Sequence, residues 1–102
     1  MPDGPVHLIA HFTVDDPVTY RRYEKGIFPT LKAHGGRFVT YDDATTVLEG
    51  DHAPGRIVIV EFDSEDACLA WWHSPEYTEI AQHRRDATTT HSIVIVHSPP
   101  PR

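Results

Sequence analysis

The order of strand-type and helix-type segments constrains the fold of this chain more than any other feature of its sequence. Four segments are rich in β-branched and aromatic residues, which favours β-strands. They are Val6–Val14, Arg37–Tyr41, Arg56–Phe62 and His91–His97, and Thr45–Glu49 is expected to continue extended after a turn at 42–44. Helical periodicity separates the first segment from the second and the third from the fourth. The predicted order is therefore strand, helix, strand, strand, helix, strand.

Both helical regions carry capping signals. Asp16-Pro17 predicts the start of the first helix, and Gly35-Gly36 predicts its end, with Gly35 in a left-handed conformation. Pro29 lies inside the apolar periodicity and lacks a backbone donor, so this helix is expected to kink or restart near 26–28. The second helical region is expected in two pieces, from Ser64 to about Trp72 and from Ser74 to about Arg85.

This order predicts an α+β domain of the ferredoxin-like type, in which one antiparallel four-stranded sheet carries its helices on one face. An apolar sheet face cannot remain in water, so the other face is expected to be covered. A second copy of the chain is the simplest cover, and a homodimer with facing sheets is therefore expected. The domain is expected to span 6–97, between a flexible leader at 1–5 and a Pro-rich tail at 98–102.

Composition excludes several classes of function. The net charge of −6 argues against binding to nucleic acid or to an anionic membrane. No apolar run approaches the ~20 residues of a membrane span, and the first residues lack the features of a signal peptide, so a cytoplasmic location is expected. The single cysteine, Cys68, excludes an intramolecular disulfide and is interpreted as a core residue rather than a nucleophile.

Alternation along the strands predicts which side chains share a face. In the first strand, one face carries Leu8, Ala10, Phe12 and Val14, and the other carries His7, Ile9, His11 and Thr13. In the third strand, one face carries Val58, Val60 and Phe62, and the other carries Ile57, Ile59 and Glu61. We expect the uniformly apolar sets to pack on the helices and the mixed sets to face the partner subunit. Both faces of His91–His97 are apolar, so its orientation is ambiguous. The polar residues expected on the partner-facing side are His11, Arg37, Tyr41 and Glu61.

Three of these polar residues are candidates for catalysis. Burial of Glu61 is costly unless the carboxylate is paired, and Arg37 can supply a bidentate partner. This pair is either a structural ion pair or a functional carboxylate at a pocket wall. His11 is the candidate general acid–base, because imidazole exchanges protons near neutral pH. The alternative for His11 is a hydrogen-bonded histidine inside the dimer interface.

Four residues of the helical regions are candidates for substrate binding. Tyr23, Trp72 and Tyr77 are expected near the sheet edge, either as core residues or as rings that stack on a planar substrate. Arg84 lies seven residues after Tyr77, so the two side chains are expected to point the same way. A cation there would bind a carboxylate or enolate, whereas a solvated helix face is the more frequent role of such an arginine.

No cofactor and no metal are expected. His7 and His11 are four residues apart on a strand, which places them roughly 13 Å apart and too far to share one ion. The sequence contains no glycine-rich phosphate loop that opens a helix and no nucleophile elbow. None of the eight histidines has a distinctive haem-ligand context.

A set of short motifs occurs in a characteristic order along nearly the whole chain, from about 6 to 97. The motifs are Asp16-Pro17 with Tyr20 and Tyr23, Pro29-Thr30-Leu31, Gly35-Gly36-Arg37, Leu48-Glu49-Gly50, Ile59-Val60-Glu61-Phe62, Ala70-Trp71-Trp72, Ser74-Pro75-Glu76-Tyr77 and Arg84. This set resembles the DUF1330 family, within the dimeric α/β-barrel superfamily. The resemblance implies a ferredoxin-like fold whose sheets pack in pairs, but no established activity.

Related barrel families include cofactor-free monooxygenases, muconolactone-type isomerases, haem-degrading enzymes and stress-response proteins, and these activities carry over by fold analogy alone. Two hypotheses are therefore kept. The first is a cofactor-free acid–base enzyme of the isomerase, lyase or monooxygenase type, acting on a small planar or carbonyl compound. The second is a non-catalytic ligand-binding or stress-related dimer. In the enzyme, His11 and Glu61 would move protons, Arg37 and Arg84 would stabilise negative charge, and Tyr23, Tyr41, Trp72 and Tyr77 would hold the substrate.

Overall fold

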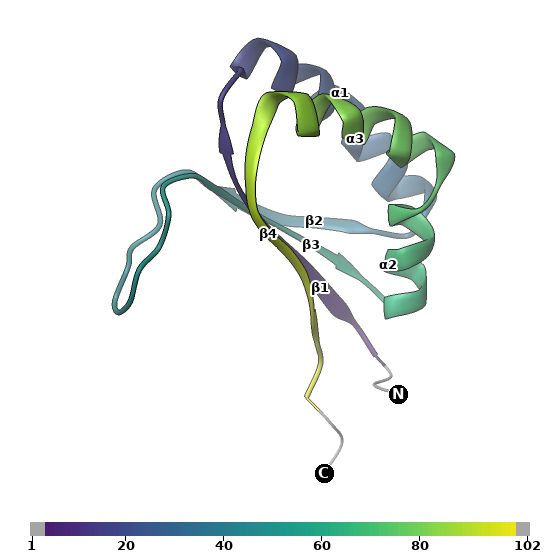
Figure 1. The fold of residues 1–102 in the computed structure, drawn as a ribbon. Coiled ribbons are helices and arrows are strands. Elements are labelled where there is room, and N and C mark those ends of the chain that lie inside the picture. Colours follow the sequence, from purple (N-terminus) through teal and green to yellow (C-terminus); the bar gives the residue numbers. More distant parts are fainter. Residues whose placement is uncertain (1–3, 100–102) are drawn as a thin grey trace.

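The computed structural model describes residues 4–99 and shows one antiparallel sheet with its three helices on one face (Figure 1). The strands are β1 (Val6–Val14), β2 (Arg37–Asp42), β3 (Arg56–Phe62) and β4 (Thr88–His97), and the helices are α1 (Pro17–Ala33), α2 (Glu65–Trp72) and α3 (Pro75–Ala87). The strand order is β2-β3-β1-β4, which is the predicted ferredoxin-like order.

Part of the predicted leader and tail, residues 1–3 and 100–102, lies outside the described residues. Next to those segments, the Ser98 hydroxyl donates a hydrogen bond to the carbonyl of Pro5. Within residues 4–99, no helix is long and apolar enough to cross a membrane.

The helices begin and end where their capping residues predict. The Asp16 carboxylate accepts hydrogen bonds from the backbone N–H groups of Val18 and Thr19, both at 3.2 Å. The hydroxyl of Ser74 likewise accepts from the N–H of Tyr77 at 3.2 Å. Gly35 follows α1 with φ of +74°, as expected for a left-handed helix end.

The predicted restart of the first helix near 26–28 does not occur. Helix α1 continues through Pro29 without interruption, because its buried face packs on the sheet and on α3 and stabilises the helix more than local propensity does. Gly26 has a packing role instead. A Cβ at this position would lie 2.8 Å from Cγ2 of Ile80, so glycine permits the close approach of α1 and α3.

Alternation places the core as predicted in β1 and β3. Leu8, Ala10 and Phe12 are buried against the helices, and the intervening residues of β1 face the bare side. The register pairs Ala10 with Ile93 and Leu8 with Ile95. These pairings resolve the ambiguity of the last strand, because they place Ile93 and Ile95 on the helix side. Strand β4 also begins at Thr88, three residues earlier than expected.

A β-bulge in β2 makes the prediction for Tyr41 wrong. The register shifts between Phe38 and Thr40, and Tyr41 pairs with Val58, a helix-facing residue. The Tyr41 ring therefore lies on the helix side, 6.2 Å from the ring of Phe38 and 4.7 Å from the guanidinium carbon of Arg56. One inserted residue exchanges the two faces of a strand beyond it, which an alternating sequence pattern does not reveal.

Residues 43–55 leave the sheet and form a long arm that extends away from the body of the domain (Figure 1). Thr45–Glu49, which was expected to stay extended, is not part of the described sheet. At the base of the arm, Nε of Arg56 donates to Asp43 at 2.7 Å. Leu48, in the outer part of the arm, is 90% exposed.

Gly36 provides a test of the packing between the end of α1 and the sheet. A Cβ at Gly36 would lie 2.7 Å from Cε1 of Phe62, whose ring is wholly buried. We expect Gly36→Ala to lower the free energy of unfolding by about 1–3 kcal/mol, measured by urea denaturation. The same substitution in a Phe62→Leu background should cost less, because the clashing ring is gone. An equal cost in both backgrounds would contradict this explanation.

Candidate functional site

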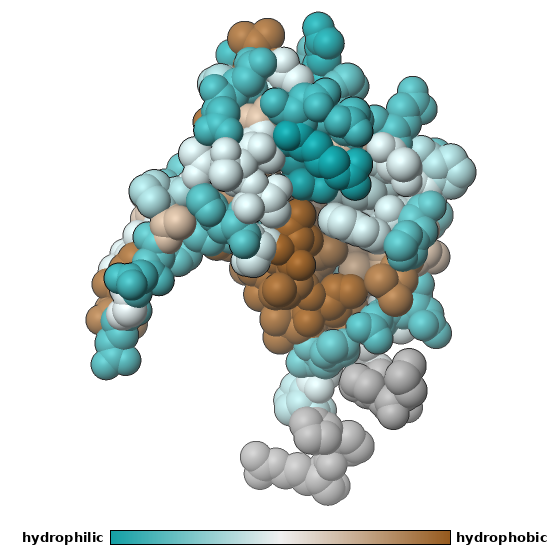
Figure 2. Space-filling view, viewed as in Figure 1, coloured by the Kyte–Doolittle hydropathy of each residue, from teal (hydrophilic) through white to brown (hydrophobic). Residues whose placement is uncertain are grey.

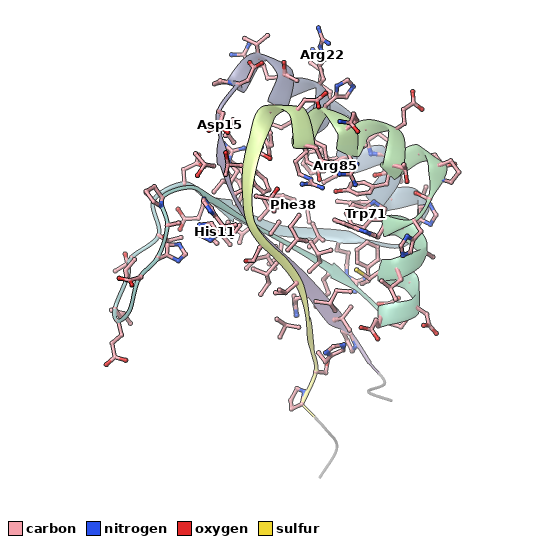
Figure 3. The ribbon with its side chains drawn as sticks, viewed as in Figure 1. His11, Asp15, Arg22, Phe38, Trp71 and Arg85 are labelled. Carbon is pink, nitrogen blue, oxygen red and sulfur yellow. The ribbon has the colours of Figure 1, made fainter. Side chains whose placement is uncertain are left out.

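The predicted site residues lie on both faces of the sheet. His11, Arg37 and Glu61 project from the bare face, whereas Tyr23, Trp72, Tyr77 and Arg84 gather between the sheet and the helices. In Figure 3, the label of His11 lies near the arm and that of Trp71 lies under the helices. The two sets are separated by the sheet, so within one subunit they cannot contact the same small ligand.

His11 and Glu61 also lie far apart on the bare face. Strand β1 pairs His11 with Ile57 and His7 with Glu61, so the two candidates are separated by four residues, roughly 13 Å. The Glu61 carboxylate accepts from Nε of Arg37 at 2.9 Å, and its other oxygen lies 3.2 Å from Nε2 of His7. The predicted Arg37–Glu61 pair is therefore present, in the form of an ion-pair network at one end of the sheet.

His11 belongs to a cluster of three imidazoles where the arm meets the sheet. Its ring stacks on that of His52, with centroids 4.4 Å apart and planes 5° apart, and lies 4.7 Å from the ring of His91. Because a carbonyl can only accept, Nε2 of His11 donates to the Ala53 carbonyl at 3.0 Å. The Thr13 hydroxyl donates its one hydrogen to the carbonyl of Pro54 at 2.7 Å. It therefore accepts from Nε2 of His91, at 2.8 Å.

This cluster therefore fixes the arm to the sheet by hydrogen bonds. Among residues 4–99, no group of three or more histidine, cysteine or acidic side chains is arranged to hold a metal ion.

The helix-side set surrounds a small apolar cavity. Its volume is about 20 Å³, which is room for about one water molecule. Core residues of β1, β3 and β4 form the floor, and Tyr23 from α1, Trp72 from α2 and Tyr77 from α3 form the wall. The hydroxyls of Tyr23 and Tyr77 hydrogen-bond at 2.9 Å and connect α1 to α3. Burial raises the pKa of Tyr23 well above its usual range, so this phenol stays neutral at neutral pH.

Arg84 lies in the same cavity and is only 2% exposed, so its interpretation as part of a solvated helix face is wrong. Its guanidinium carbon is 5.9 Å from the ring centre of Tyr23 and 5.8 Å from that of Trp72, within the range of cation–π attraction. Its hydrogen bond to the Thr90 hydroxyl is long, at 3.5 Å, and its Nε has no hydrogen-bond partner among residues 4–99. The ion pairs within that range do not include Arg84.

A wider groove lies beside the cavity, between β4 and α2. Its volume is about 490 Å³. Leu8, Trp72 and Ile93 line both the groove and the cavity, so the half-buried ring of Trp72 forms part of the wall between them. Figure 2 shows a continuous apolar surface over this region of the molecule.

The sequence predicted the role of Cys68 but not that of Arg56. Cys68 is wholly buried, and burial raises the pKa of its thiol to about 11, which confirms the interpretation as a core residue. Arg56 was not predicted to interact with aromatic rings. Its guanidinium carbon lies 5.2 Å from the ring centre of Tyr20 and close to Tyr41. The bulge in β2 brings Tyr41 to this side of the sheet, and no local motif marks it.

Comparisons with known proteins agree with the fold. A family model described as a domain of unknown function (DUF1330) matches residues 5–98, whereas no curated protein matches the sequence. A protein of unknown function from Rhodopseudomonas palustris is 21% identical, with a TM-score of 0.76 over 97% of this chain and 85% of that chain. A dimeric protein of unknown function and ferredoxin-like fold from Bacteroides fragilis is 14% identical, with a TM-score of 0.64 over 96% of this chain and 100% of that chain.

SnoaB, a cofactor-independent oxygenase from Streptomyces nogalater, is 18% identical, with a TM-score of 0.59 over 96% of each chain. At these identities, the structural likeness shows the fold alone.

Arg84 is buried without an ion-pair partner among residues 4–99, so its replacement is expected to stabilise the protein. Arg84→Met removes a buried cation and retains much of its apolar volume, so we expect it to raise the free energy of unfolding of the ligand-free protein by about 1–4 kcal/mol. Thermal or urea denaturation measures this change. The control is Arg85→Met on the exposed side of α3, which should stay within about 0.5 kcal/mol of the parent. A loss of about 3–5 kcal/mol in Arg84→Met would instead show a paired structural charge.

Proposed function

This chain belongs to the DUF1330 family, and we propose that it is a homodimer in which each subunit binds a small planar or carbonyl compound between its sheet and helices and acts on it by cofactor-free acid–base chemistry. The observation that carries this proposal is the convergence of Tyr23, Tyr77 and Arg84 in one apolar cavity. An apolar enclosure with a few convergent polar groups is typical of a small-molecule site.

The polar groups of the cavity have complementary chemical properties. The neutral Tyr23 phenol can donate a proton or a hydrogen bond to a substrate oxygen, and its contact with Tyr77 orients both hydroxyls. The Arg84 guanidinium can stabilise the negative charge that develops on an enolate or a similar oxygen. These steps suit an isomerase, a lyase or a cofactor-free monooxygenase. SnoaB, which is described as a cofactor-independent oxygenase, shares this fold and supports the monooxygenase alternative.

The bare face of the sheet supports the dimer. Its centre is aliphatic and formed by Ile9, Ile57, Ile59, Val94 and Val96. Val94 and Val96 are 48% and 45% exposed in the single chain. A two-fold axis would bring this strip against its own copy, which removes the apolar surface from water. The structurally similar protein from Bacteroides fragilis, which is described as dimeric, supports a homodimer.

In this dimer, His11, Arg37 and Glu61 would lie at the subunit interface. Their contacts in the single chain give them positioning roles: His11 holds the arm, and the Arg37–Glu61 pair fixes one end of the sheet. We therefore assign contact with the ligand to Tyr23, Trp72, Tyr77 and Arg84. The second hypothesis, a non-catalytic ligand-binding dimer, would use the same cavity and differ only in the absence of turnover.

A charge in the aliphatic strip tests the dimer. We expect the parent protein to sediment as a dimer at micromolar concentration and Val94→Glu to weaken or abolish the dimer, because each subunit would bury an unpaired carboxylate in the interface. Val18→Glu is the matched control, since Val18 is 66% exposed on α1, away from the bare face. A parent protein that stays monomeric at high concentration would contradict the proposed interface.

Loss of the phenol hydroxyls tests the acid–base role. A panel of phenols, lactones and keto acids is first screened by thermal shift, since a ligand of the folded state raises the melting temperature. For a compound that is turned over, we expect Tyr23→Phe or Tyr77→Phe to lower kcat by about 10²- to 10⁴-fold with little change in binding. Tyr20→Phe on α1, which does not line the cavity, is the control.

The other outcomes of this screen are also informative. Binding without turnover of any compound would favour the non-catalytic hypothesis. Flat melting temperatures across the whole panel would contradict both hypotheses.

A further inference from the structure

Arg84 is a buried cation that the described part of the chain does not neutralise. Within residues 4–99 its Nε lacks a hydrogen-bond partner, and the guanidinium makes cation–π contacts with the rings of Tyr23 and Trp72. The Tyr23 phenol is neutral at neutral pH and supplies no counter-charge. Burial of a guanidinium without an anion is strongly unfavourable, so its retention in a packed cavity calls for a partner from outside the chain.

We propose that the cavity binds a planar organic oxyanion, a carboxylate or the enolate of a conjugated carbonyl compound, whose charged oxygens pair with the guanidinium of Arg84. This inference rests on the proposed function, because it names the ligand class of the same cavity. A guanidinium presents a planar fork of N–H donors that matches the two oxygens of a carboxylate. The free Nε–H of Arg84 is one of these donors.

The shape of the wall explains the preference for a planar molecule. The rings of Trp72 and Tyr77 lie 5.4 Å apart with planes 35° apart, and the rings of Tyr23 and Tyr77 lie 6.2 Å apart. Flat aromatic walls favour stacked or edge contacts with a flat ligand. Apolar residues such as Ile27 and Val60 complete the enclosure and offer nothing to a hydrated, non-planar polar molecule.

Room for such a ligand comes from the adjoining groove. The cavity of about 20 Å³ is too small for an aromatic acid, but the groove between β4 and α2 measures about 490 Å³, and Trp72 lines both. Rotation of the half-buried Trp72 ring would join the two spaces and place Arg84 at the inner end of the combined pocket. At the outer rim, Nε2 of His97 lies 2.9 Å from the Glu65 carboxylate. The charged end of the ligand is therefore expected at Arg84 rather than at the acidic rim.

The negative net charge of the protein makes anion binding a specific sign of a local cation. With a net charge of −6, the chain as a whole does not attract anions. Selective binding of an anion over its neutral analogue would therefore report a local cation, and Arg84 is the cation of the cavity lining.

The test compares two probes of nearly equal shape, benzoate and benzamide, on the full chain. Binding is measured by thermal shift and calorimetry at constant ionic strength, with sodium chloride as the salt control. We expect benzoate to raise the melting temperature and benzamide to bind about 10- to 100-fold more weakly, since a charge-assisted hydrogen bond is lost. Arg84→Met should reduce benzoate affinity by a similar factor, Arg84→Lys should retain part of it, and Arg85→Met should bind as the parent does.

Each other outcome overturns the inference in a distinguishable way. Equal affinity for benzoate and benzamide would show a pocket that does not select anions. Equal benzoate affinity in the parent and in Arg84→Met would place the anion elsewhere on the protein. Binding of neutral phenols or lactones without any binding of carboxylates would overturn the anion inference and leave the proposed function standing. No binding of any compound would overturn both.

Discussion

The packing of all three helices on one face of the sheet is the constraint on which the rest of this structure depends. It divides every strand into residues that face the helices and residues that do not. On the helix side, Leu8, Ala10 and Phe12 form the floor of the core and of the cavity. On the other side, the same strand presents Ile9 between His7 and His11. A sheet covered once has an enclosed side suited to binding a ligand and an open side suited to binding another subunit.

Periodicity was sufficient to predict the ferredoxin-like fold, because alternation and capping report directly on strand faces and helix ends. Periodicity gave a wrong prediction where a β-bulge inserts one residue and exchanges the faces of the strand beyond it. The bulge at the middle of β2 moves Tyr41 to the helix side, although the pattern Arg37-Phe38-Val39-Thr40-Tyr41 alternates without a visible break. The expected helix restart before Pro29 failed for a different reason, since tertiary packing of α1 outweighs the loss of one backbone hydrogen bond.

The sequence predicted which residues belong to the candidate site better than it predicted which of them lie together. Tyr77 and Arg84 share a helix face through their spacing, and the structure brings them together with Tyr23 and Trp72 in one cavity. His11 and Glu61 lie at opposite ends of the bare face because of the register between β1 and β3. The sequence alone does not give this register. The sequence also could not predict that Arg84 has no counter-charge among the described residues, because this is a property of the folded surroundings and not of any motif.

Strand β1 links the two sides of the sheet, because it is central and flanked by β3 and β4. Leu8 and Ala10 touch the cavity, and the residues next to them along the chain face outward. Covering the bare face with a second sheet would hold β1 in place from behind. The part of the cavity boundary that moves would then be Trp72 at the end of α2, which is only half-buried. The Tyr23–Tyr77 hydrogen bond connects α1 to α3, so Arg84 and the tyrosine hydroxyls would keep their positions while the Trp72 ring moves to admit a ligand. Such preorganisation is what electrostatic stabilisation of a developing oxyanion requires.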